Sequence, residues 1–140
     1  MLQNYLVDTN VILDVVLGRE GNAEAIQCFE IFDQKPDFGA WIAPHTPAIV
    51  HYVGRKQIGN ERVFVILKQM AARFQIAPFT NQLMQEALCY GMSDFEDAMQ
   101  SACAEGIEAR GIITRDRKDF KNSPVPFLTP AEFVAQHGSP

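Results

Sequence analysis

Four aspartates lie at the ends of the most apolar segments of this chain. Asp8 closes the first apolar run, Asp116 follows a later one, and Asp94 and Asp97 open an apolar helical stretch. An isolated carboxylate is costly to bury, because it loses its hydration without gaining a partner. Either each aspartate pairs with its own cation, or several of them converge on one metal ion.

The charge of converging aspartates determines the chemistry that they could perform. Two carboxylates about 4 Å apart repel each other by roughly 4 kcal/mol at an effective dielectric constant of about 20. Several of them therefore need a cation to stay ionised together, and ligand sets made only of oxygen favour Mg²⁺ or Mn²⁺ over Zn²⁺. Such an ion can polarise a phosphate and generate hydroxide. We predict that Asp8, Asp94, Asp97 and Asp116 form a metal site suited to phosphodiester hydrolysis.

Asp8 also has an explanation that needs no metal. Asp8, Thr9 or Asn10 could cap the helix that follows. One cap would suffice, however, and three polar residues here interrupt two apolar runs, so we favour a functional role for Asp8. We expect Asn10 to fasten the loop through side-chain to backbone bonds. Asp14, inside the apolar helix, is either a group that supports the site or an ion-pair partner.

The second pair of aspartates lies at a helix start. Ser93 and Glu96 have the spacing of a capping box, and Asp94 would then lie in the first turn, where the helix dipole favours a negative charge. This pattern leaves Asp97 unexplained. Asp97 borders the apolar face and lies about one turn after Asp94, where like charges destabilise a helix by roughly 0.2–0.5 kcal/mol. A cation at that edge would reverse the sign of the interaction.

Asp116 on its own would be read as part of a charged turn, because local ion pairs at a surface contribute only about 0–1 kcal/mol each. Its position after an apolar strand, like that of Asp8, favours a role in the site. We expect Asp119 to be a turn residue and Phe120 to anchor the loop. The surrounding cations are a local basic rim or a solvated face.

Short apolar strands alternate with helical patterns along the chain. We predict strands at residues 2–7, 39–43, 75–78, 111–114 and 125–128. Helices are predicted at residues 10–17, 22–33, 46–56, 61–74, 81–90 and 93–105. Thr46 with Pro47 is the predicted start of the third helix. A capping box from Thr129 to Glu132 predicts a last short helix.

This alternation predicts an α/β fold with a mostly parallel central sheet flanked by helices. The length of 140 residues fits one domain, which we place at residues 1–136, with 137–140 as a frayed tail that leaves His137 solvated. In parallel sheets the functional crevice lies beyond the carboxyl ends of the strands. Asp8 and Asp116 each stand just past a strand, so both should lie at that edge.

Composition excludes several classes of protein. The net charge of −5 argues against binding nucleic acid by overall attraction. No apolar run approaches the length of about 20 residues that a membrane span needs, and the first residues lack the features of a signal peptide. Cys28, Cys89 and Cys103 lie among apolar neighbours without zinc-site spacing. We interpret them as buried free thiols of a cytoplasmic protein.

Taken together, the motifs resemble those of the PIN-domain nucleases, which include the VapC toxins of bacterial and archaeal toxin–antitoxin pairs. The likeness runs in order through Leu6–Asp14, Asp94–Ala98, Ile112–Phe120 and Leu128–Phe133. It implies a PIN-like domain, a Mg²⁺ or Mn²⁺ site, RNA cleavage, a homodimer and an antitoxin partner. The acidic residues of the family correspond to Asp8, Asp97 and Asp116 and, in a branch with an Asp-Phe-Glu-Asp motif, to Asp94.

One position departs from the family pattern. The resemblance implies a glutamate near the start of the third helix, where this chain has Ile49. We favour the interpretation that Asp94 supplies the missing carboxylate. The alternatives are weak metal binding, or a catalytically inactive PIN-fold module that binds RNA or a protein partner. His45 and His51 nearby are interpreted as structural rather than facing a substrate.

The leading hypothesis is therefore a Mg²⁺- or Mn²⁺-dependent endoribonuclease of the toxin type. A phosphotransferase would also use aspartates at strand ends, but haloacid-dehalogenase-like enzymes need a second acid where this chain has Asn10. Asn10 or Thr114 would orient the site, and the residues that could also meet the RNA are Asn10, Thr114, Arg115, Arg117 and Lys118. Local ion pairs would occupy the cations among these equally well.

Overall fold

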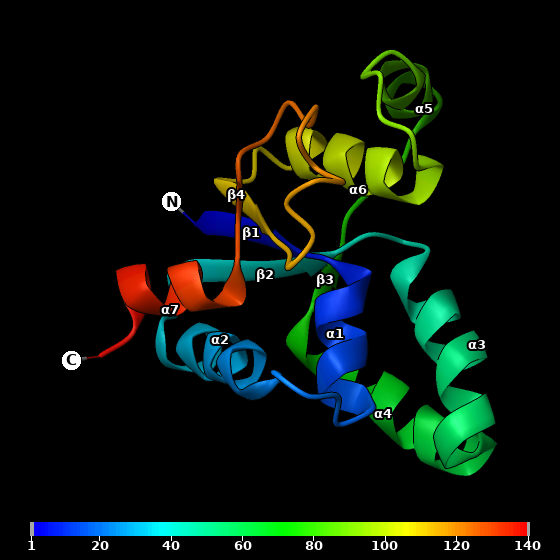
Figure 1. Cartoon of the computed structure of the whole chain (residues 1–140), viewed down its shortest axis with the longest axis vertical. Helices are drawn as coiled ribbons and strands as arrows, with labels where there is room; N and C mark the ends of the chain where they lie inside the picture. Colours follow the sequence, from blue (N-terminus) through cyan, green and yellow to red (C-terminus); the bar gives the residue numbers. More distant parts are fainter. Residues whose placement is uncertain (1, 140) are drawn as a thin grey trace.

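Five parallel strands form the centre of the structure, a computed structural model that describes residues 2–139. They are β1 (Gln3–Val7), β2 (Phe38–Ile42), β3 (Gln75–Ile76), β4 (Gly111–Ile113) and β5 (Phe127–Leu128). Their order is β3-β2-β1-β4-β5, and every neighbouring pair is parallel (Figure 1). The prediction of a mostly parallel sheet is confirmed, and β1 lies at its centre.

The helices agree with the sequence prediction in number and place. They are α1 (Thr9–Val16), α2 (Ala23–Gln34), α3 (Thr46–Ile58), α4 (Asn60–Arg73), α5 (Asn81–Leu88), α6 (Phe95–Gly106) and α7 (Pro130–His137). Each predicted strand and helix is present, with its ends displaced by at most two residues. Over residues 2–139, no helix has the length and apolar character needed to cross a membrane.

The sheet is covered on both faces, because successive side chains of a strand point to opposite sides. Tyr5 and Val7 pack into a core shared with α1, α2 and α7, whereas Leu6 and Ile112 pack on the other side against Cys103 of α6. Figure 1 shows α6 on one side of the sheet and α2 and α7 on the other. A parallel strand buried on both faces needs a continuous apolar sequence, which agrees with the buried residues Tyr5–Val7 of β1 and Gly111–Ile113 of β4.

The start of α7 agrees with the prediction, but its end does not. Thr129 and Glu132 form the predicted capping box, with both reciprocal hydrogen bonds present. His137 was expected to be solvated, yet it is the last residue of α7 and its ring lies 4.9 Å from that of Phe133. Its Nε2 is 3.2 Å from the Tyr5 hydroxyl oxygen. The reason is helical spacing: His137 lies four residues after Phe133, and therefore on the same core-facing side.

The three cysteines are free, but they are not all buried. Cys28 and Cys103 are buried, and burial raises the pKa of both thiols to about 12. Cys89 is exposed, so the prediction for this residue is wrong. It follows the end of α5, which contacts its neighbours through Ala87 and Leu83. The apolar side of this short helix therefore faces α6 without including Cys89.

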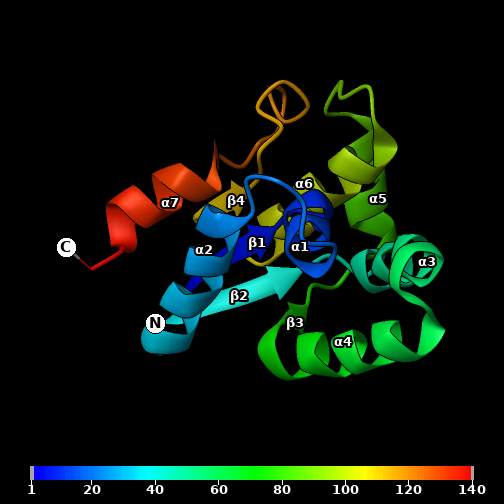
Figure 2. The same ribbon diagram turned by 60° about the horizontal axis from the view of Figure 1, so that its bottom comes forward.

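The helices α3 and α4 form a hairpin at one edge of the molecule (Figure 2). Gly59 connects them with a φ of +88°, a conformation that favours glycine. Gly54 lets the helices approach closely, since a Cβ atom there would lie 2.9 Å from Val63 Cγ2. The hairpin places α4 beside α1 and α2, where the three helices border an apolar groove described below.

Phe133→Ala should destabilise the fold strongly. Phe133 is fully buried and stacks on Phe32 at 5.2 Å between ring centroids. Removing such a ring leaves a cavity, and the expected loss in unfolding free energy is about 3–5 kcal/mol. Urea denaturation would measure it. Phe64→Ala is the matched control, because Phe64 is 50% exposed; the expected change there is within about 0.5 kcal/mol. Similar losses in both variants would contradict the assigned core.

Candidate functional site

Asp8 is the innermost carboxylate of the site. It follows β1 and is only 1% exposed. Asp8 occupies the N-cap position of α1, but its side chain makes no cap hydrogen bond. Its Oδ1 accepts a hydrogen bond from Gln100 Nε2 at 2.8 Å, and its Oδ2 accepts one from Thr114 Oγ1 at 2.9 Å. The interpretation of Asp8 as a simple side-chain cap is therefore wrong.

Asp116 lies close to Asp8 because β4 is paired with β1. The Asp116 N–H donates to Thr114 Oγ1 at 3.0 Å, and Asp116 Oδ2 accepts from Asn10 Nδ2 at 3.4 Å. Asn10 was expected to bond to the backbone, but it contacts the Asp116 side chain instead. Thr114 is fully buried, and its hydroxyl forms hydrogen bonds with both Asp8 and Asp116. It therefore orients Asp8 and Asp116, and the expectation that it also meets the substrate stays a prediction.

Asp94 and Asp97 lie at the start of α6. Asp94 Oδ1 accepts a hydrogen bond from the Asp97 N–H at 3.0 Å, so Asp94 is the N-cap. The prediction that Ser93 caps this helix is wrong, because the helix begins later than the sequence pattern suggests. The cap bond uses one oxygen of the exposed Asp94 carboxylate and leaves the other able to bind a cation. Asp97 is partly buried.

These carboxylates act on one another electrostatically. Burial, followed by the charges of Asp94, Asp8, Asp119 and Asp116, raises the pKa of Asp97 to about 7. Burial also raises the pKa of Asp8, and the charge of Asp116 adds to this effect. The structure therefore brings the four predicted aspartates into one field of negative charge. Asp119, which was expected to be only a turn residue, contributes to it as well.

The donor set fits a hard divalent cation. Its members are carboxylates, and burial, followed by the charges of the neighbouring aspartates, disfavours the ionised form of Asp97 in the absence of a metal ion. Within residues 2–139, no three acidic, histidine or cysteine side chains are grouped closely enough to hold a metal ion as they stand. The cluster is thus looser than a site in which all four aspartates touch the ion. Mg²⁺ commonly keeps several waters and uses only one or two carboxylates.

The region around the family's glutamate position supplies no carboxylate. Ile49 is partly buried and packs against the apolar core. Both ring nitrogens of His45 are buried without a hydrogen-bond partner, and burial lowers the pKa of this side chain. His51 shares a hydrogen bond with Asn60 across the α3–α4 hairpin at 2.8 Å. The contact of His51 agrees with a structural role. The charges of Glu96 and Asp94 act on His45, and its structural role stays a prediction.

The arginines that follow β4 are engaged in ion pairs. Arg115 Nε lies 3.1 Å from Asp14 Oδ2, and Arg117 Nη2 lies 2.9 Å from Glu132 Oε1. The other oxygen of Asp14 lies 3.4 Å from Arg19 Nη1. Asp14 is therefore an ion-pair partner, and it ties the loop after β4 to α1.

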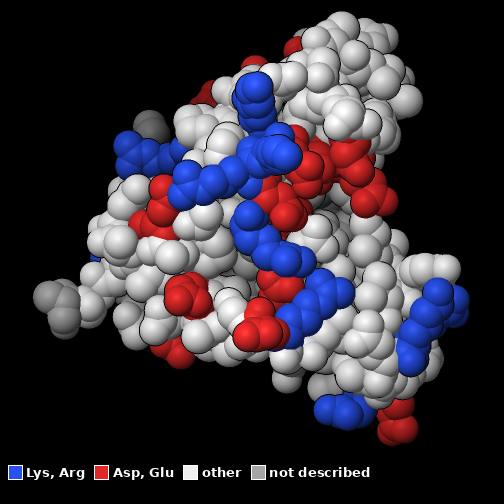
Figure 3. Space-filling view, viewed as in Figure 1, with Lys and Arg blue, Asp and Glu red and all other residues white. Residues whose placement is uncertain are grey.

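The same loop presents positive charge beside the acidic cluster. Its exposed cations are Arg115, Arg117, Lys118 and Lys121. Figure 3 shows a band of Lys and Arg side chains across this face, with Asp and Glu side chains gathered alongside it. Because the chain as a whole is acidic, a polyanion would be attracted to this face locally rather than to the whole surface.

The sequence did not identify Gln100 as a side-chain partner of Asp8, nor Thr9 and Thr46 as the buried residues behind it. Gln100 contacts Asp8, its Oε1 accepts from the Thr9 N–H at 3.1 Å, and Thr9 Oγ1 lies 2.8 Å from Thr46 Oγ1. Thr46 was expected to be the cap of α3, but His45 precedes the helix and the buried Thr46 hydroxyl faces Thr9. The sequence did contain one signal for Gln100, because a glutamine on the apolar face of a predicted helix must find hydrogen-bond partners in the core.

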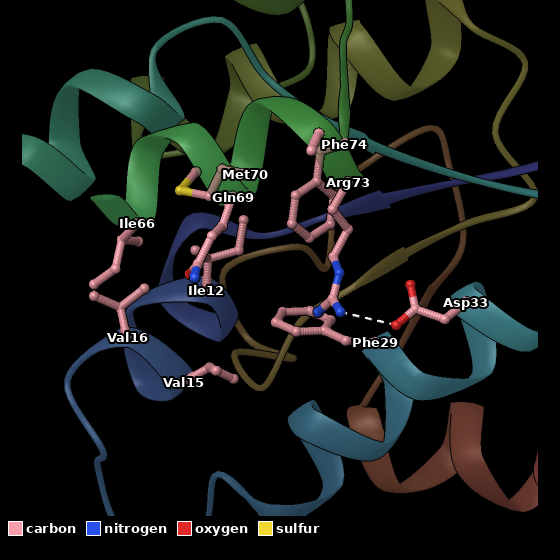
Figure 4. A pocket seen from close by; sticks show the side chains of 11 residues that line it. Ile12, Val15, Val16, Phe29, Asp33, Ile66, Gln69, Met70, Arg73 and Phe74 are labelled. Atoms are coloured by element: carbon pink, nitrogen blue, oxygen red, sulfur yellow. Dashed lines mark hydrogen bonds and ion pairs between the residues drawn. The ribbon is translucent and has the colours of Figure 1, made fainter. Parts of the chain in front are cut away.

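A second concave surface lies between α1, α2 and α4 (Figure 4). It is a groove of about 560 Å³ whose lining combines apolar side chains such as Val16, Ile66 and Met70 with the polar Asp33, Gln69 and Arg73. Arg73 crosses its edge, with Nη2 2.8 Å from Asp33 Oδ2. None of the four aspartates lines this groove. It is therefore a separate surface, which we call the α1–α2–α4 groove.

Asp97→Asn should stabilise the metal-free protein at high pH. The pKa of about 7 in the folded protein lies above the value of about 3.9 for an unfolded carboxyl. The folded state thus favours the protonated form, and stability is lost as pH rises from about 4 through 7. Asparagine stays neutral, so the melting temperature of the variant should exceed that of the parent at pH 8 and approach it at pH 5.

Calorimetry in a buffer with chelator would measure this difference. Asp37→Asn is the matched control, because Asp37 is exposed and lies outside the cluster. The same difference between variant and parent at both pH values would contradict the raised pKa.

The sequence and the fold are similar to those of known proteins. A family model described as a PIN domain matches residues 4–118. No protein with a curated description matches the chain in sequence. The structure resembles a chain of the VapBC2 complex of Rickettsia felis bound to a DNA fragment from its promoter, with a TM-score of 0.71, 18% identity, and coverage of 91% of this chain and 98% of that chain.

Two further solved structures have similar folds. DNA-bound VapBC from Salmonella typhimurium gives a TM-score of 0.72 at 14% identity and covers 93% of this chain and 99% of that chain. FitAcB from Neisseria gonorrhoeae gives a TM-score of 0.66 at 17% identity, with coverage of 91% and 98%. Identities this low establish the likeness of the fold alone.

The family match extends over most of the sequence. Its residues, 4–118, include Asp8, Asp94, Asp97 and Asp116. The five-stranded parallel sheet and the order of its helices agree with the solved structures of similar fold. The chain therefore belongs to the PIN domain family.

Proposed function

We propose that this protein is a Mg²⁺- or Mn²⁺-dependent endoribonuclease and the toxin of a toxin–antitoxin pair. The observation that carries the proposal is the cluster of Asp8, Asp94, Asp97 and Asp116 at the carboxyl edge of the central strands. Membership of the PIN domain family supports a nuclease. The choice of RNA as substrate and the toxin role follow from the resemblance of the motifs to the VapC branch.

We assign a separate role in metal-dependent hydrolysis to each group of residues in the site. Asp8, Asp97 and Asp116 would hold the ion, and Asp94 would supply the carboxylate that Ile49 cannot. When bound, such an ion polarises the phosphate and lowers the pKa of a water so that it can attack. The buried Asp8 is kept in place by hydrogen bonds from two sides. The half-exposed positions of the other carboxylates leave them accessible to a substrate.

The basic loop after β4 supports a polyanionic substrate. Lys118 and Lys121 are exposed and lie in the segment that also carries Asp116. Arg115 and Arg117 are exposed too, although each forms an ion pair with a carboxylate. The partner of Arg115, Asp14, is buried. The Arg117–Glu132 pair lies at the surface, where ion pairs contribute only about 0–1 kcal/mol, so RNA phosphates could compete for Arg117. Contacts of this kind would position the strand rather than read its sequence.

Asp8→Asn and Asp97→Asn should each abolish cleavage of single-stranded RNA in the presence of Mn²⁺. Loss of a group that stabilises transition-state charge typically costs about 100-fold or more in rate. Gel-based cleavage of a labelled RNA would measure it, and Asp37→Asn is the charge-matched control. The metal mechanism is wrong if cleavage survives both substitutions or continues in excess chelator.

A second candidate function is a catalytically weak or inactive PIN-fold module that binds RNA or a protein partner. The absence of a carboxylate at Ile49 favours it, as does the loose grouping of the carboxylates within residues 2–139. Calorimetric titration with Mn²⁺ separates the two candidates. A nuclease of this kind should bind the ion at or below millimolar concentration, whereas an inactive module should show no binding there.

We propose further that an antitoxin protein docks in the α1–α2–α4 groove (Figure 4). The chains of similar fold from Rickettsia felis and Salmonella typhimurium occur in VapBC complexes, which supports a protein partner here. The groove offers an apolar floor, and the Arg73–Asp33 pair at its edge offers polar contacts. An amphipathic segment with apolar residues at helical spacing would match such a surface.

Val16→Lys or Ile66→Lys should prevent a partner from binding in the groove, because a buried ammonium group would face its apolar lining. The probe is the product of a small gene adjacent to this one, co-expressed with the tagged chain, and copurification is the readout. Leu88→Lys is the control, since Leu88 is 64% exposed and lies on α5. Retained copurification with both groove variants would place the partner elsewhere.

The homodimer and the cytoplasmic location expected from the sequence stay predictions. Tyr52, Phe64 and Val65 on the α3–α4 hairpin are about half exposed, and they offer apolar surface of the kind that a dimer interface buries. The free thiols of Cys28 and Cys103 are consistent with a reducing compartment.

A further inference from the structure

Gln100 is a deeply buried, uncharged polar side chain that contacts the candidate site and has no role in the chemistry proposed above. It is 1% exposed, on the core-facing side of α6. Its Nε2 donates to Asp8 Oδ1 at 2.8 Å, and its Oε1 accepts from the Thr9 N–H at 3.1 Å. The two ends of the Gln100 amide thus bind Asp8 and Thr9, which are neighbours in the sequence but lie far from Gln100 along the chain.

The orientation of the Gln100 amide is determined by its surroundings. The Thr9 backbone N–H can only donate, so it must face the amide oxygen. A flipped amide would point its NH₂ group at this donor and its oxygen at the Asp8 carboxylate, leaving two repulsive contacts in a buried place. The Gln100 NH₂ group is therefore fixed toward Asp8.

Gln100 also satisfies a backbone donor at the start of α1 that the Asp8 cap does not reach. Asp8 stands at the N-cap of α1, where an aspartate side chain usually accepts a hydrogen bond from a free N–H of the first turn. Here the α1 cap lacks a side-chain hydrogen bond from Asp8, and the Thr9 N–H is satisfied by Gln100 from another helix. The Asn10 backbone N–H approaches the Asp8 carboxylate and acts to lower its pKa, but it does not reach full hydrogen-bond geometry.

The second side of Asp8 is held in an equally defined way. Thr114 Oγ1 accepts from the Asp116 N–H and donates its proton to Asp8 Oδ2. Gln100 and Thr114 thus each use one lone pair, on different oxygens of the same carboxylate. A carboxylate has about four lone-pair sites, so Asp8 keeps free sites in addition to the two that Gln100 and Thr114 use. Fixing both oxygens also fixes the plane of the carboxylate.

We infer that Gln100 is a positioning residue that accepts from the first N–H of α1 and, with Thr114, sets the plane in which Asp8 presents its free lone pairs to a divalent cation. The inference rests on the proposed metal-dependent function. Partners that orient a metal ligand commonly change metal affinity by about 10–100-fold when they are removed. Gln100 would then act through Asp8 and would not touch the ion or the RNA.

The test compares Mn²⁺ affinity, measured by calorimetry, with melting temperature in four variants. Gln100→Met keeps the length of the side chain but removes its donor, and the dissociation constant for Mn²⁺ should rise about tenfold or more. If Gln100→Met does not fold, Gln100→Asn serves instead, because its shorter side chain draws the donor away from Asp8. An unchanged Mn²⁺ affinity in a folded Gln100 variant would overturn the inference.

Two further variants separate positioning from loss of stability. Thr46→Val removes the buried Thr46–Thr9 contact but leaves the Gln100–Asp8 bond, so it should lower the melting temperature and keep the Mn²⁺ affinity. Ser101→Ala, next to Gln100 on α6, removes a buried hydroxyl that has no hydrogen-bond partner, and it should leave both quantities unchanged. A fall in affinity that follows the melting temperature across all variants would show a merely structural role.

An NMR measurement without metal tests the contact between Gln100 and Asp8 independently of the proposed function. The side-chain NH₂ signals of Gln100 in an NMR spectrum should exchange slowly with solvent, and they should shift strongly in Asp8→Ala. If the parent protein binds no Mn²⁺, the proposed function fails. The NMR signals then decide alone whether Gln100 holds Asp8: rapid exchange, or no shift in Asp8→Ala, would overturn the inference.

Discussion

The burial of one carboxylate, that of Asp8, is the constraint on which the arrangement of the site depends. A carboxylate that is 1% exposed has lost nearly all its hydration, and without compensating hydrogen bonds this would cost several kcal/mol. Gln100 and Thr114 supply those bonds from α6 and from the end of β4. Both elements must therefore keep their positions relative to β1, which couples the order of the sheet to the geometry of the site.

The parallel pairing of β1 with β4 provides this coupling. Because the two strands end at the same edge, Asp8 and Thr114 each directly follow their strand and lie within hydrogen-bond distance of each other. The helix α6 crosses the same edge and contributes in two ways. Asp97 at its first turn adds negative charge, and Gln100 about one turn later restrains the carboxylate that faces it. Burial and the charges of the neighbouring aspartates raise the pKa of Asp97. The contacts of α6 with Asp8 and Thr9 hold Asp97 in this environment.

The helix α1 connects the two surfaces of functional interest. Its first residues, Thr9 and Asn10, contact Gln100 and Asp116 of the acidic site. Its second half lines the α1–α2–α4 groove. Between them Asp14 ties α1 to the loop after β4 through Arg115. A protein bound in the groove would rest on the same helix that carries part of the site, so the two surfaces share one rigid element while remaining chemically distinct.

The sequence by itself determined the elements, their alternation and the placement of the strand-end aspartates. Apolar runs and helical spacing are local properties, and they predicted the parallel sheet and the meeting of Asp8 with Asp116. Local patterns were misleading where two residues could fill the same role or where tertiary packing outweighed a polar sequence. Ser93 had the spacing of a cap but Asp94 took the role, and His137 lay in a polar tail but on the same helical face as Phe133.

The tertiary structure alone decided which side chains hold the aspartates. Gln100 and Asp8 are 92 residues apart, and Thr114 and Asp8 are 106 apart. No local periodicity relates such positions, because their contact exists only after the sheet has formed and α6 has packed against it. The same holds for Thr46, whose hydroxyl faces Thr9 inside the core instead of capping its own helix. The four aspartates could therefore be read from the chain, whereas the neutral residues that orient Asp8 became visible only in the fold.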